Sequence, residues 1–120
     1  MTHRDGVIDR ERASLLAHDV GKYVARIAKN VAPGGPLPAA LVPLLVKDLY
    51  ALAGGRASAR FEELAAGVSD ERLEQARAHL AAIDRLEARV RAGEQAACVE
   101  ACDHARRIEA ALSELAREAR

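Results

Sequence analysis

Apolar residues recur every three or four positions along most of the chain, and this spacing predicts amphipathic helices. The first predicted helix runs from about Asp9 to about Val31. It is followed by the segment 32–36, Ala-Pro-Gly-Gly-Pro, in which two prolines lack backbone N–H groups and two glycines are conformationally free. The apolar stripe of this helix consists of Leu16, Val20, Tyr23, Val24, Ile27 and Val31.

A second helix is predicted to begin near Pro38 or Pro43, because a proline in the first turn of a helix costs little. The pair Gly54-Gly55 marks its end. Leucine and valine cover most of the circumference of this helix. We therefore expect it to be the most buried helix of the fold.

A short helix is predicted to follow from Ala59 to Ala66. Ser58 is a candidate N-cap for it, because a serine hydroxyl accepts hydrogen bonds from free N–H groups of the first turn, and Gly67 marks its end. By the same reasoning, Ser69 or Asp70 caps a third long helix.

The third long helix ends near Ala92, and after a turn at Gly93 the last helix runs from about Glu94 almost to the C-terminus. Helices joined by so few residues pack as an antiparallel hairpin. The sequence therefore predicts an all-α fold in a single domain, residues 1–120, with four main helices in a bundle and one additional short helix. The predicted seam of the last helix consists of Cys98, Ala101, Ala105, Ile108, Leu112, Leu115 and Ala119.

Composition agrees with this fold and narrows the classes of function. Half of the 120 residues are hydrophobic, mostly alanine and leucine, which favour helix. The 18 basic residues match the 18 acidic ones, so the chain lacks the basic surplus with which proteins bind nucleic acid. No apolar run reaches the roughly 20 residues that span a bilayer, and the N-terminus lacks the apolar stretch of a signal peptide. We expect a cytoplasmic protein that binds neither nucleic acid nor membrane.

Cys98 and Cys102 are one helical turn apart, a geometry unsuited to a disulfide, so we expect two free thiols. His104 is nearby in sequence, but on a helix it projects from the other flank than Cys102. We therefore predict no metal site here and no cofactor elsewhere. His79 is predicted to lie on a flank of the third long helix.

The candidate for chemistry is His18, which the helical periodicity places opposite the apolar stripe. Gly21 and Ala25 leave the surface beside it bare, and Lys22 follows one turn later. An exposed imidazole can accept a phosphoryl group, an adjacent carboxylate such as Asp19 can hold the ring, and a nearby lysine can neutralise phosphoryl oxygens. Glycine inside a helix costs about 1 kcal/mol relative to alanine, and access to the histidine is one reason to tolerate it.

The stretch 18–24, His-Asp-Val-Gly-Lys-Tyr-Val, resembles the phosphoacceptor helix of sensor histidine kinases and of Spo0B-like phosphotransferases, in which His-Asp or His-Glu opens a dimerising helix. It is also similar to histidine phosphotransfer (Hpt) domains, in which Lys-Gly follows the histidine. Here Gly21 precedes Lys22, and Tyr23 occupies the place of the kinase proline. The resemblance implies a phosphoryl carrier, rather than an enzyme in its own right, that exchanges the group with a kinase or a response-regulator receiver domain. The Spo0B-like form implies a homodimer and the Hpt form a monomer.

Two other interpretations remain open. The stretch 15–22 is similar to the Leu-Leu-His-Asp-Ile-Gly-Lys motif of HD-type metal phosphohydrolases, which use an earlier histidine as a further metal ligand. His3 is the sole histidine that precedes His18. The other interpretation is a non-catalytic helical bundle for protein–protein interaction, in which His18 is an ordinary surface residue.

Overall fold

The computed structural model describes residues 9–31, 38–66, 68 and 70–118, and within them it contains helices and no strand, which confirms the all-α class. The two longest connections between helices are residues 31–38 and residues 66–70. No described helix is both long and apolar enough to cross a membrane. The elements are α1 (Arg10–Asn30), the 3₁₀ turn η1 (Ala39–Leu41), α2 (Val42–Ala53), α3 (Arg56–Ala65), α4 (Glu71–Arg91) and α5 (Gln95–Glu118).

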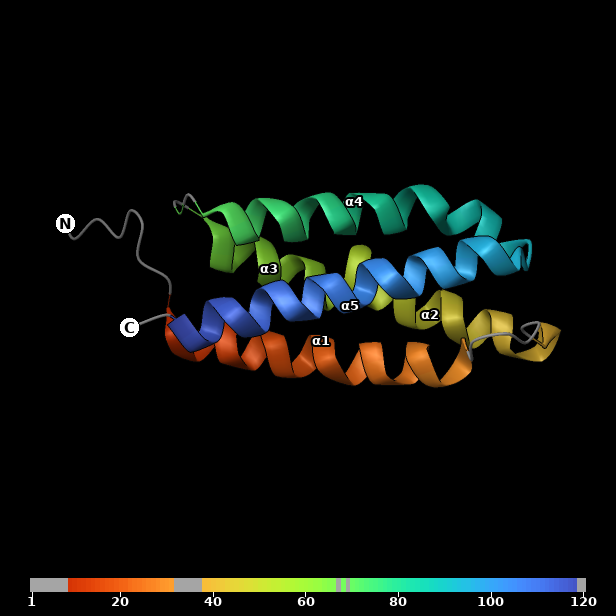
Figure 1. The fold of residues 1–120 in the computed structure, drawn as a ribbon, viewed down its shortest axis with the longest axis horizontal. Helices are drawn as coiled ribbons and strands as arrows, with labels where there is room; N and C mark the ends of the chain where they lie inside the picture. The colour runs from red at the N-terminus through yellow and green to blue at the C-terminus, as the bar shows by residue number, and fades with distance from the viewer. Residues whose placement is uncertain (1–8, 32–37, 67, 69, 119–120) are drawn as a thin grey trace.

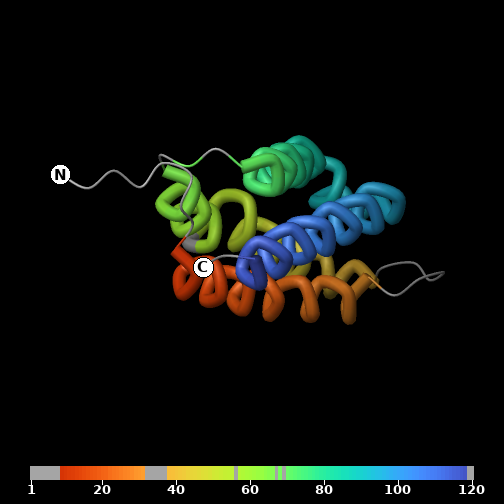
Figure 2. The backbone as a smooth tube through the Cα atoms, turned by 60° about the vertical axis from the view of Figure 1, so that its left-hand side comes forward, coloured from red at the N-terminus to blue at the C-terminus, as the bar shows by residue number. Residues whose placement is uncertain are grey.

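The helices form an elongated antiparallel bundle (Figure 1). Helices α1 and α4 run in one direction, and α2, α3 and α5 run in the other. Because α2 and α3 are short, they lie one after the other and together occupy the fourth position of the bundle. Helix α5 packs between α1 and α4, and α4 and α5 form the predicted hairpin (Figure 2).

Two carboxylates cap the N-termini of the long helices α1 and α4. The side chain of Asp9 accepts a hydrogen bond from the backbone N–H of Arg12 at 3.1 Å, and Asp70 accepts one from the N–H of Arg72 at 2.8 Å. Each satisfies a backbone donor that has no partner inside its helix. The start of α1 and the cap Asp70 of α4 agree with the predictions from the sequence. The alternative cap, Ser69, lies outside the described residues.

The prediction for the short helix was wrong at its start. Helix α3 begins at Arg56, directly after Gly55, so Ser58 lies inside the helix and does not cap it. Because α2 ends at Ala53, only Gly54 and Gly55 separate the two helices. A Cβ atom at Gly54 would lie 2.9 Å from Cε1 of Tyr50, and one at Gly55 would lie 3.2 Å from Cα of Ala51, so this short connection favours small residues. The N-cap position is Gly55, which has no side chain to cap α3. Gly67, the predicted end, lies outside the described residues.

The core follows the predicted stripes, but its centre is α5 and not α2. Helix α2 buries one face and exposes Leu44 and Tyr50, which are 50% and 62% accessible. It also contacts α1 and α4, but α5 packs more extensively against both and uses alanines for close approach. The expectation that α2 is the most buried helix was therefore wrong. Six residues of the two predicted stripes are buried together with four leucine and isoleucine residues of α2 and α4: Leu16, Val20, Ile27, Ile108, Leu112 and Leu115 with Leu45, Leu49, Leu80 and Ile83.

One carboxylate lies in the interface between α1 and α2. Asp48 is 8% accessible, and its Oδ1 lies 3.4 Å from Nη2 of Arg26. The guanidinium of Arg26 also lies over the ring of Tyr23, 5.0 Å from its centroid. The arginine thus neutralises a buried charge that would otherwise be costly.

Candidate functional site

His18 lies on the outer face of α1, as the helical periodicity predicts. Its side chain is exposed, and Leu15, Lys22 and Ala25 are exposed beside it on the same face. Within the described residues no hydrogen bond or ion pair engages the imidazole. The nearby Leu15 is 58% accessible, an unusual exposure for a leucine. The result is an imidazole that can be reached from solvent, with an apolar side chain on one side of it and an ammonium group on the other.

Asp19 points away from His18 and toward α3. Its carboxylate forms an ion pair with Arg60 of α3, and its Oδ1 also lies 3.8 Å from Nζ of Lys22. The expectation that Asp19 holds the imidazole ring is therefore wrong. One residue advances a helix by about 100°, so the side chain next to His18 already faces the neighbouring helix. In this position Asp19 anchors Lys22 and links α1 to α3.

The surface beside Gly21 is covered on one side by α5. A Cβ atom at this glycine would lie 2.8 Å from Oε2 of Glu109. The bare surface predicted beside His18 is therefore limited to the side of Ala25, which is exposed. The Glu109 carboxylate occupies the space beside Gly21, but as the end of a flexible side chain it can move aside at little cost, so this contact does not require a glycine.

The cysteine prediction is confirmed: Cys98 and Cys102 are free thiols, and both are buried. Burial raises the pKa of both thiols, which keeps them in the unreactive protonated form. No group of three candidate metal ligands occurs in the part of the chain that the structure describes, and His3, the further ligand of the HD interpretation, lies outside it.

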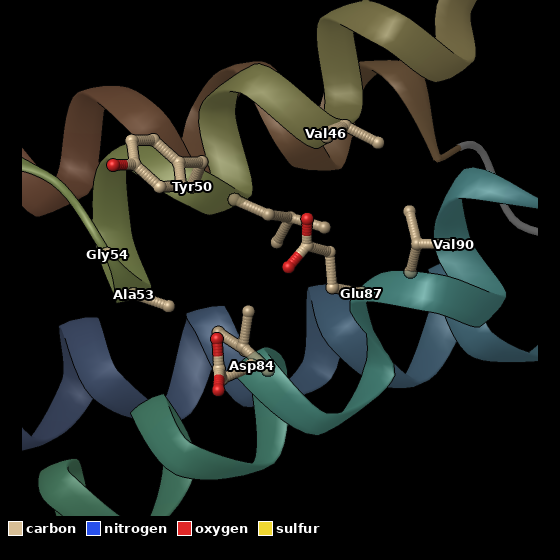
Figure 3. Close-up of a pocket in the computed structure, with 9 residues that line it drawn as sticks. Val46, Tyr50, Ala53, Gly54, Asp84, Glu87 and Val90 are labelled. Carbon is tan, nitrogen blue, oxygen red and sulfur yellow. The ribbon is translucent and has the colours of Figure 1, made fainter.

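An apolar crevice lies between α2 and α4 (Figure 3). Val46 and Tyr50 of α2 and Val90 of α4 line it, and the carboxylate of Glu87 points from α4 into the space between the two helices. Its volume is about 20 Å³, which is enough for about one water molecule. The crevice is therefore a packing gap and too small to hold an organic substrate as it stands.

The sequence missed the contact between His79 and His104. The two half-buried side chains meet across α4 and α5, with 2.8 Å between their Nδ1 atoms. Each histidine was assigned separately to the flank of its helix. Their distances from the turn at Gly93, 14 and 11 residues along the chain, were the available signal, because residues at similar distances from a hairpin turn lie at similar heights.

Comparisons with known proteins give no relative. No protein-family model matches the chain, and neither the curated proteins nor the solved structures contain a significant match.

Proposed function

We propose that this chain is a histidine phosphoacceptor module, which receives a phosphoryl group on His18 and exchanges it with a response-regulator aspartate or with a kinase. The observation that carries the proposal is the position of His18. It is exposed on the outer face of a long helix, with no competing partner among the described residues. A ring nitrogen there can be approached in line by a phosphoryl donor on another protein.

The transfer needs an unprotonated ring nitrogen as the nucleophile. This nitrogen forms a bond to phosphorus while the bond from phosphorus to the donor oxygen breaks, and the electron pair leaves on that oxygen. Lys22, exposed on the same face, offsets charge on the phosphoryl oxygens. Asp19 acts as a positioning residue, because its ion pair with Arg60 keeps a carboxylate within 3.8 Å of the Lys22 ammonium group.

The surroundings of His18 also suit a protein partner. Leu15 offers an exposed apolar contact one turn before the histidine, and the small side chain of Ala25 leaves space on the other side. The Glu109 carboxylate lies at the edge near α5, where its charge opposes an approaching phosphoryl group. We infer that the partner covers His18 together with Leu15 and Lys22 and stays away from the edge at α5.

The test is phosphoryl transfer with the kinases and phosphorylated receiver domains of the host. The wild-type protein should acquire a label that is labile in acid and stable in base, and the label should be absent from His18→Gln. His79→Gln is the matched control and should be labelled like the wild type. A label that persists in His18→Gln contradicts the proposal. A protein that no host kinase or receiver labels contradicts it as well, and that result favours the non-catalytic interaction bundle.

A further inference from the structure

The contact between His79 and His104 is a straight hydrogen bond between two imidazoles. The Nδ1 atoms are 2.8 Å apart and the ring centroids 5.1 Å apart. The centroid distance equals the Nδ1–Nδ1 distance plus the two ring radii, so both Nδ1 atoms lie on the line between the ring centres. In this arrangement the N–H of one ring points directly at the lone pair of the other, as in a strong hydrogen bond.

The surroundings assign the donor. Nε2 of His104 lies 3.6 Å from Oε2 of Glu100, so the proton of neutral His104 is favoured on Nε2, facing the carboxylate. The Nδ1 atom of His104 then carries a lone pair and accepts the hydrogen bond. His79 is consequently the donor, with its proton on Nδ1.

The charged groups that act directly on the two rings belong to α5, whereas Glu71 and Arg72 of α4 line the same surface groove as His79. Burial, the neighbouring His104 and the cation of Arg107 lower the pKa of His79, and the carboxylate of Asp103 opposes them. Glu100 faces the outer nitrogen of His104. No charged side chain of α2, which also packs on α4, interacts with either ring among the described residues.

We propose that His79 and His104 form a pH-sensitive link between α4 and α5. The hydrogen bond is present while one proton lies between the two Nδ1 atoms, and it breaks when both Nδ1 atoms are protonated. The first added proton leaves one proton between the two Nδ1 atoms and the hydrogen bond in place. The second protonates the other Nδ1 atom, so that two N–H groups and two positive charges face each other. The link is independent of the chemistry proposed at His18.

The direction of the pH effect follows from proton counting. In the unfolded chain both imidazoles take up protons near pH 6.5, whereas the folded pair resists the second proton. Below about pH 6.5 the unfolded state therefore binds more protons than the folded state, and stability falls as the pH falls. One uncompensated proton raises the ratio of unfolded to folded protein by up to about tenfold per pH unit.

The geometry favours a shared proton over a shared metal ion. Two imidazoles that bind one metal direct their lone pairs to a common point away from the line between the nitrogens. Here each lone pair points at the other ring, so both rings would have to rotate to bind a metal. In addition, no third ligand completes a cluster among the described residues.

Two measurements on the full chain test the link. The first is the NMR shifts of the ring nitrogens from pH 8 to pH 4.5. At neutral pH we expect Nδ1 of His79 to be protonated and Nδ1 of His104 to be unprotonated, and both Nδ1 atoms should be protonated only at the acid end of the range. Two Nδ1 atoms in the same protonation state at neutral pH would overturn the proposal, and this measurement needs no variant.

The second measurement is urea unfolding over the same pH range. The unfolding equilibrium constant of the wild type should rise toward tenfold per pH unit below about pH 6.5. His79→Gln and His104→Gln should each lose most of this dependence, whereas His18→Gln, which removes an exposed histidine, should retain it. An unchanged pH dependence in His79→Gln overturns the link. Stoichiometric Zn²⁺ or Cu²⁺ binding that His79→Gln abolishes also overturns it, in favour of a metal site.

Discussion

Leu44 and Leu45 provide a matched test of the core, because they are neighbours of the same type on one helix and differ in burial. Leu45 is fully buried and Leu44 is 50% accessible. Leu45→Ala removes about three buried carbon groups, at about 0.8 kcal/mol each, and leaves a cavity. The expected loss of stability is about 2–5 kcal/mol. Leu44→Ala should cost about 1 kcal/mol or less, since half of the side chain already contacts water.

The assay is urea unfolding followed by circular dichroism, with thermal melting as a second readout. We expect Leu45→Ala to lower the unfolding midpoint without a change in slope and to lower Tm by about 10 °C or more. Leu44→Ala should shift Tm by a few degrees at most. Equal effects of the two substitutions, or a larger effect for Leu44, would show that the face of α2 assigned to the core is wrong.

Three further predictions concern single features of the fold. Gly93 has φ of +78°, so Gly93→Ala should cost about 1–2 kcal/mol in urea unfolding, and an unchanged midpoint would contradict the turn geometry. Cys98 and Cys102 are buried with raised pKa, so they should react with a thiol reagent only as fast as the protein opens, and reaction at the rate of a free thiol would refute their burial. Hydrogen bonding and charge from Arg72 lower the pKa of Asp70, so its stabilisation should be complete above about pH 4 and decline below it, whereas Asp70→Asn should lack this acid-dependent loss.

The periodicity of the sequence was enough to predict the long helices and their buried faces. Such a pattern reports the angular position of each residue within one helix, and this is why the exposure of His18 and the burial of Ile108 followed from it. Asp70 was named as a candidate cap of α4 by local chemistry alone. These features depend on neighbours within a few residues, and such local features can be predicted from the sequence.

Features that depend on how helices meet were not predicted. Asp19 was read as a partner of His18, but its partner Arg60 lies on another helix, 41 residues along the chain. Gly21 was read as open surface, but the Glu109 carboxylate of α5 lies against it. The sequence did not supply the register between helices that brings these side chains together.

The central claim is that His18 accepts a phosphoryl group, and it can be measured without knowing the partner. The ¹⁵N-labelled protein is incubated with phosphoramidate, a small phosphoryl donor, and the imidazole nitrogens are followed by NMR, with free imidazole in the same solution as an internal standard. The account predicts that His18 is phosphorylated before His79 and His104, because the Nδ1 atoms of these two are hydrogen-bonded to each other. It also predicts slower phosphorylation in Lys22→Ala. An unmodified His18 in a solution where the free imidazole is phosphorylated would contradict the claim.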